Sequence, residues 1–100
     1  MTKPNLSIRE SFLDLNESKL NGNPILSALW YDGKGDWDTA HAQVDQLEGK
    51  NAARIHAYLH RKEGDLWNAD YWYRRSGDSR PESSLEEEWE VLLSRFWDGK

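Results

Sequence analysis

The chain has 100 residues, no cysteine and a net charge of −5, which excludes disulfides and thiolate metal sites and disfavours a general nucleic-acid-binding protein. The first residues lack the apolar stretch of a signal peptide, and no apolar run reaches the roughly 20 residues that cross a bilayer. We therefore expect one helical domain over 1–100, cytoplasmic and without a membrane partner, in which residues 1–6 form a flexible tail.

Capping signals mark the first two predicted helices. Ser7 and Glu10 have the spacing of a capping box, in which each side chain bonds the other residue's backbone amide. Apolar residues at helical spacing follow, and Asn21-Gly22 ends this helix. Asn23 is the predicted N-cap of the second helix, with Pro24 in the first turn, where its missing N–H costs nothing.

Two Gly-Asp pairs, Gly35-Asp36 and Gly64-Asp65, predict bends between helices. Glycine can adopt the left-handed conformation that ends a helix, and aspartate can cap the next one. Helices are predicted over 37–47, 51–63 and 66–76, with Asn51 as a cap. A shift of 29 residues superimposes the two pairs, and it also aligns small residues: Ala28 with Ala57 and Ala40 with Ala69. This periodicity indicates two repeat-like hairpins, 21–49 and 50–83.

The last predicted helix begins with another capping box, in which Ser83 and Ser84 precede Glu86 and Glu87 by three residues. Its apolar residues share one face, which suits a C-terminal packing helix over 84–97: Leu85, Trp89, Leu92, Leu93 and Phe96. No segment alternates with the period of a strand. The sequence therefore predicts an all-α fold of about six short helices in stacked antiparallel hairpins.

The second unit resembles the tetratricopeptide repeat. Ala69, Tyr73 and Pro81 have the spacing of that family's second helix, and Gly64 lies at the usual corner. The resemblance is best over 50–83 and weaker over 21–49. The first helix departs from the family pattern at four positions: Ala53, His56, Ala57 and His60. The resemblance implies a protein-interaction scaffold with a concave groove lined by the first helix of each hairpin.

A second resemblance involves the same part of the chain. The segment from His56 to Arg61, followed by Gly64-Asp65 and by Tyr71 to Arg75, looks like a group of small bacterial proteins with no assigned role. That resemblance favours a bacterial origin and implies no activity.

Residues 50–81 carry a net charge of +3 between two acidic segments. Within them, Arg54, Tyr58 and Arg61 share one helix face, the face that lines the groove in the tetratricopeptide family. By that resemblance, they would hold an acidic peptide or a terminal carboxylate, since the arginine fork suits bidentate contacts. The alternative is that these residues pair with aspartate or glutamate from the acidic flanks.

Trp67, Tyr71 and Arg74 form a stripe of the helix 66–76, which also carries Trp72. A short helix seldom buries aromatic residues all round unless it is central. The preferred interpretation is therefore a helix sandwiched between neighbours; the alternative is a stripe exposed for binding or dimerisation. Aromatic residues interleaved with arginine also allow base stacking, so a nucleic-acid-binding accessory protein is a further alternative.

His56 and His60 are one helical turn apart, and Glu63 follows one turn later. This spacing can chelate a metal ion, with His41, Asp38 or Asp70 joining from a neighbouring helix. The alternative is interior histidines whose ring nitrogens bond to neighbours. No nucleophile–base pair and no phosphate-binding loop stands out.

These patterns favour a non-catalytic module for protein interaction or self-association, one that binds an acidic segment or a carboxylate and needs no cofactor. A homodimer is compatible with the aromatic surplus. The competing hypothesis is a small metal-binding or hydrolytic protein that uses His56 and His60.

Overall fold

The computed structural model describes residues 8–20 and 22–99, and over these ranges it contains helices and no strand. The elements are α1 (Ile8–Leu13), the 3-10 helix η1 (Glu17–Leu20), α2 (Pro24–Gly33), α3 (Trp37–Val44), α4 (Lys50–Glu63), α5 (Leu66–Ser76) and α6 (Leu85–Phe96). This confirms the all-α fold of about six short helices. The predicted tail and Ser7 of the first capping box lie outside the described residues. No helix in the described part of the chain is long and apolar enough to cross a membrane.

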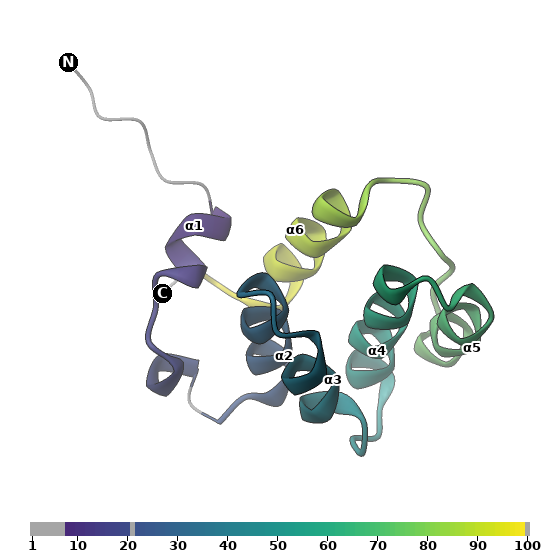
Figure 1. Cartoon of the computed structure of the whole chain (residues 1–100), viewed down its shortest axis with the longest axis horizontal. Coiled ribbons are helices and arrows are strands. Elements are labelled where there is room, and N and C mark those ends of the chain that lie inside the picture. The colour runs from purple at the N-terminus through teal and green to yellow at the C-terminus, as the bar shows by residue number, and fades with distance from the viewer. Residues whose placement is uncertain (1–7, 21, 100) are drawn as a thin grey trace.

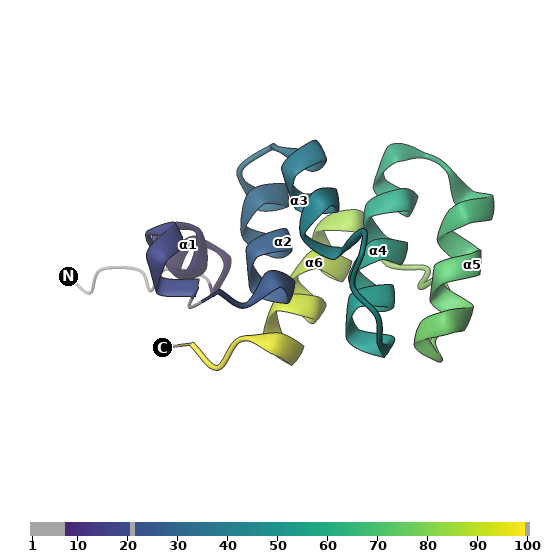
Figure 2. The same ribbon diagram turned by 90° about the horizontal axis from the view of Figure 1, so that it is seen from below.

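Helices α2 to α5 form two antiparallel hairpins placed side by side (Figures 1 and 2). α2 packs mainly on α3, and α4 packs mainly on α5. The hairpins meet where α4 contacts both α3 and α2. The close contacts are possible because small residues lie fully buried between the helices: Ala28, Ala40, Ala57 and Ala69.

The two Gly-Asp bends are present and have equivalent geometry. Gly35 and Gly64 have φ values of +90° and +93°, in the left-handed region that favours glycine. The amide of Asp36 donates to the Tyr31 carbonyl at 2.9 Å, and the amide of Asp65 donates to the His60 carbonyl at 3.0 Å. These carbonyls are themselves related by the 29-residue shift. Each aspartate then caps the following helix, by accepting from the amide of Thr39 at 3.1 Å or of Asn68 at 3.3 Å.

Other helix ends agree only partly with the sequence prediction. The Asn23 side chain caps α2, and Ser84 and Glu87 form the predicted capping box at α6. α3 ends at Val44 rather than at Leu47, because the Leu47 amide donates to the Val44 carbonyl in a tighter turn. Asn51 was the wrong N-cap for α4: the first intrahelical bond runs from the Ala53 amide to the carbonyl of Gly49.

α6 runs back along the hairpins and contacts α1, α2 and α4 (Figure 1). Its predicted apolar face is buried here, with Trp89, Leu92 and Leu93 almost inaccessible to solvent. The Trp89 indole N–H donates to the carbonyl of Leu29 at 3.1 Å. The Phe12 ring packs against Trp89 and Trp97, with centroids 6.0 and 5.1 Å away. α6 therefore fastens α1 to the hairpins and completes the main core.

Candidate functional site

α6 covers the face of α4 on which the sequence predicted a binding groove. The Arg54 Nη1 atom donates to Oε2 of Glu88 at 2.7 Å, and Arg61 Nη1 donates to Oε1 of the same carboxylate at 2.6 Å. The Tyr58 hydroxyl donates to Asp32 Oδ2 at 2.7 Å. Only 6% of Arg54 and 2% of Tyr58 are exposed. The acidic group that this face holds is therefore part of the chain itself.

The Glu88 carboxylate is the centre of a buried network. It is 1% exposed and also accepts from the Tyr73 hydroxyl at 2.6 Å. Burial is the main reason that the pKa of Tyr73 is well above its usual value, and the hydrogen bond to Glu88 raises this pKa further. Asp78 extends the network by accepting from Arg54 Nε at 2.9 Å. Three donors satisfy a charge that would otherwise be costly to bury.

These contacts match the alternative in which the basic residues pair with acidic flanks. A role for Arg54 and Tyr58 in binding an external partner stays a prediction, and it would require α6 to move. The Arg61 side chain is 16% exposed and lines an open hollow between α5 and the following loop. Of the three groove residues, it is the one that can contact a partner while α6 stays in place.

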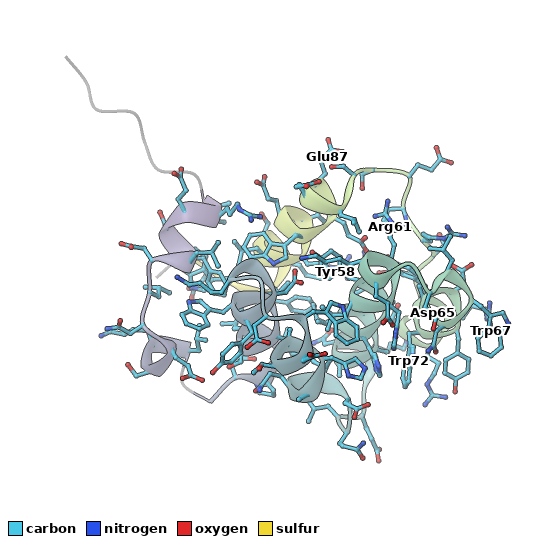
Figure 3. The ribbon with its side chains drawn as sticks, viewed as in Figure 1. Tyr58, Arg61, Asp65, Trp67, Trp72 and Glu87 are labelled. Carbon is cyan, nitrogen blue, oxygen red and sulfur yellow. The ribbon has the colours of Figure 1, made fainter. Side chains whose placement is uncertain are left out.

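The stripe of α5 predicted for binding lies on the outer surface. Trp67 is 78% exposed, and in Figure 3 it projects from the outer edge of α5, away from α4. Tyr71 and Arg74 are also exposed. Among the helices described, only α4 packs against α5, so the preferred sandwich arrangement was wrong. Ala69 and Tyr73 on the opposite side are buried because they face α4 and Glu88.

Two arginines flank the exposed aromatic rings. The guanidinium of Arg75 lies 5.7 Å from the centroid of Tyr71 and 5.4 Å from that of Trp72, within cation–π range. Arg74 lines the hollow that Arg61 also lines, whose volume is about 580 Å³. Within 8–20 and 22–99, no carboxylate forms an ion pair with Arg74 or Arg75. Both positive charges are thus available to a partner.

The three histidines of the chain come together where the two hairpins meet. His41 belongs to α3, whereas His56 and His60 belong to α4. His41 Nε2 and His56 Nε2 are 3.0 Å apart, and one nitrogen of each of the three rings lies within 4.8 Å of the others. The Nδ1 atom of His60 contacts Glu63 Oε2 at 2.6 Å. His56 and His60 are buried, and His41 is partly exposed.

Two tryptophans hold the histidine rings from either side. Trp37 stacks on His41 with an interplanar angle of 8°, and Trp72 of α5 stacks on His56 with ring centroids 4.1 Å apart. The Trp37 indole N–H is fixed by the Leu59 carbonyl at 2.8 Å. The pKa of His56 is lowered to about 4, mainly by burial and further by the neighbouring His60 and His41. His56 is therefore a neutral imidazole at neutral pH.

The structure brings together most of the predicted metal-binding residues. His56, His60 and Glu63 are adjacent, and His41 is the residue that joins them from a neighbouring helix. Neither Asp38 nor Asp70 belongs to a possible metal-binding group within the described ranges. Asp70 instead pairs with Arg80, whose Nε lies 3.0 Å from Oδ1.

Some residues of these sites were missed in the sequence. No role was predicted for Glu88 from the sequence, although this residue lies between Leu85 and Leu92 on the apolar face of α6. A lone charge on such a face signals a buried partner of opposite charge. The packing of Trp37 and Trp72 on the histidines had no local signal, because each pair depends on how separate helices dock.

Comparison of the chain with protein-family models, with curated proteins and with solved structures finds no match in any of the three. The tetratricopeptide resemblance therefore stays a prediction. Function must be inferred from the geometry of the exposed α5 face and of the histidine cluster.

Proposed function

We propose that the chain is a non-catalytic interaction module that binds an acidic protein segment through the outer face of α5. One observation carries this proposal: an exposed tryptophan lies on a helix that packs against a single neighbour, beside two arginines that form no ion pair with any described residue. We call the surface made by Leu66, Trp67, Tyr71, Arg74 and Arg75 the α5 face.

The composition of the α5 face suits a protein partner. Tryptophan, tyrosine and arginine are the residues most enriched among those that dominate binding energy. Trp67 and Tyr71 supply large apolar areas with few rotatable bonds. Leu66, 42% exposed, adds an aliphatic edge. A monomer gains nothing from exposing such a cluster, whereas burying one large side chain stabilises a complex by about 1.5–3 kcal/mol.

The charge of the partner follows from the arginines. Arg74 and Arg75 present planar forks that bind carboxylates in a bidentate manner, and Arg61 lies in the adjoining hollow. An acidic segment carrying an apolar residue satisfies both the cations and Trp67. A second copy of the chain offers such a surface on α6, where Glu86 and Glu90 are exposed beside Val91. The test must therefore distinguish self-association from binding to a different protein.

The test measures fluorescence anisotropy of labelled peptides that contain a leucine or tryptophan within a run of glutamates. Matched peptides with glutamine in place of glutamate serve as the uncharged comparison. We expect the acidic peptides to bind more tightly, and their affinity to fall as salt is added. The variant Trp67→Ala/Arg74→Glu should bind at least about tenfold more weakly, because it removes an anchor and reverses a charge.

Val91→Ala is the matched control, since Val91 is an exposed apolar residue on α6, away from α5. Its affinity for the peptides should equal that of the wild type. Equal binding of acidic and neutral peptides, or unchanged binding by the double variant, would contradict the proposal. Light scattering over a range of concentrations reports self-association, and a dimer abolished by the double variant would identify the partner as a second copy.

A further inference from the structure

We propose that His41, His56 and His60 bind a divalent transition-metal ion of the zinc type at the junction of the two hairpins. They are all the histidines in the chain, and they come from two helices separated by a loop. Their convergence is a tertiary feature that the i, i+4 pair on α4 alone does not create.

The spacing of the rings fits one ion. In a tetrahedral zinc site with Zn–N bonds of about 2.1 Å, ligand nitrogens lie about 3.4 Å apart. Here the Nε2 atoms of His41 and His56 are 3.0 Å apart. One nitrogen from each of the three rings lies within 4.8 Å of the other two. Small rotations of the imidazole rings would bring all three to bonding distance.

Glu63 orients one of the ligands. It bonds Nδ1 of His60, so the proton of a neutral His60 ring lies on Nδ1 and the Nε2 lone pair is free to bind a metal. A carboxylate behind a metal-binding histidine is a recurring arrangement that fixes the tautomer and strengthens the ligand. Trp37 and Trp72 stack on His41 and His56 and support these two rings from outside the cluster.

The rings contact one another closely. His41 and His56 lie at hydrogen-bonding distance, so one of the two neutral rings donates and the other accepts. Here His41 and His56 direct the same kind of nitrogen at each other, and His60 lies beside both, with centroids at 5.2 and 4.8 Å. Each neutral ring has one lone pair, and a single metal ion accepts three of them at once. Nitrogen-only ligands favour zinc, copper, nickel or cobalt over magnesium and calcium, which prefer oxygen.

His41 is partly exposed, so solvent reaches the edge of the cluster. A hollow of about 320 Å³ is lined in part by Asp45, which lies near His41, and by Trp72, which stacks on His56. Asp45 Oδ1 lies 3.9 Å from His41 Nε2 and is within reach of the fourth position. Three histidines and one exchangeable ligand make a site that can load and release its metal.

The first experiment titrates the full chain, purified without a histidine tag, with Zn²⁺ in a calorimeter. We expect one ion per chain and a rise in the melting temperature, because the ion binds only the folded form. Nitrogen-15 NMR of the histidine rings should show shifts at His41, His56 and His60 on addition of zinc. Absence of zinc binding, or ring shifts confined to His60, would overturn the proposal without relying on any variant.

Variants then assign the ligands. His41→Gln should weaken zinc binding by at least about 100-fold, since two imidazoles bind much less tightly than three. Glu63→Gln should weaken it by about 10- to 100-fold, as expected for an orienting partner. Asp38→Asn, an exposed carboxylate on α3 outside the cluster, is the matched control and should bind zinc normally.

The variants also test the competing site formed by His60, Glu63 and Asp65. If His41→Gln binds zinc as the wild type does and Glu63→Gln does not bind it, that second group is the ligand set and our proposal is wrong. The absorption spectrum of the Co²⁺-loaded wild type gives an independent result. Intense visible bands indicate four-coordinate cobalt, whereas weak bands indicate a six-coordinate, oxygen-rich site.

Discussion

At the residue scale, the buried Glu88 side chain joins α6 to two other helices. Its carboxylate receives hydrogen bonds from Arg54, Arg61 and Tyr73, which lie on α4 and α5. Removing Glu88 leaves the buried Arg54 with only the more exposed Asp78 as an anionic partner, and such a loss costs more than the intact network contributes. Glu88 therefore links α6 to the second hairpin by charge as well as by packing.

Glu88→Ala should lower the free energy of unfolding by about 3–5 kcal/mol, because it leaves Arg54 buried without its main partner. Glu88→Gln keeps the volume of the side chain and should lower the free energy of unfolding by less. Urea denaturation followed by circular dichroism measures both. Glu90→Ala, at an exposed position on the same helix, is the control and should change stability by no more than about 0.5 kcal/mol. Similar losses for Glu88→Ala and Glu90→Ala would contradict the buried network.

The sequence identified several polar residues of the two sites correctly, but it did not identify the residues that they contact. The side chains of Arg54, Tyr58 and Arg61 share a face because helical periodicity is local. Which carboxylate meets them depends on where α6 docks, and that is decided by packing between residues distant in sequence. The same applies to His41, which was one of three candidates to join His56 and His60, and which only the contact of α3 with α4 selects.

At the scale of elements, the bends are the best-predicted feature. A Gly-Asp pair determines its own geometry, because glycine adopts the positive φ and the aspartate side chain caps the next helix within three residues. The end of α3 was harder to predict. No glycine or proline follows Val44 directly, and the helix stops in a turn that local propensity does not specify.

Gly64→Ala should destabilise the chain by about 1–2 kcal/mol, the cost of a left-handed conformation for a residue with a Cβ atom. A Cβ at Gly64 meets no atom within 4 Å, so the loss is purely conformational. Gly64→Asn should destabilise the chain less, because asparagine adopts the left-handed backbone conformation more readily than alanine does. Thermal unfolding of the two variants shows which of them is the less stable. An equal loss for alanine and asparagine would show that the φ value of this bend is not the cause.

At the scale of the whole molecule, stability should be uneven. α5 packs on one helix, whereas α2 and α4 lie between several neighbours. Its buried residues, Ala69 and Tyr73, belong to a small cluster with Ala57, separate from the main core. An element with few buried apolar contacts opens locally at a low free-energy cost.

Hydrogen exchange followed by NMR should therefore show lower protection for the amides of α5 than for those of α4 and α6. The difference should narrow when an acidic peptide binds the α5 face, since bound ligand stabilises the closed form. Equal protection of α4 and α5 in the free chain would mean that the molecule opens only as one unit.

The docking of α6 is the part of the architecture that the sequence did not reveal. Its apolar stripe and capping box predicted a packing helix, and the structure buries that stripe. The helix it would cover was not specified, since α2, α4 and α5 all present apolar residues. The tetratricopeptide resemblance implied an open groove along α4, where α6 instead inserts Glu88.

The contact of Phe12 with Trp89 and Trp97 has a consequence for biosynthesis. During translation, the hairpins can form as each emerges from the ribosome, since their helices are neighbours in sequence. The aromatic ring of α1, however, finds its binding surface only after α6 has left the exit tunnel. Phe12 therefore lacks these two aromatic partners until α6 has been made, so nascent chains stalled before α6 are the species most at risk of capture by chaperones or of aggregation.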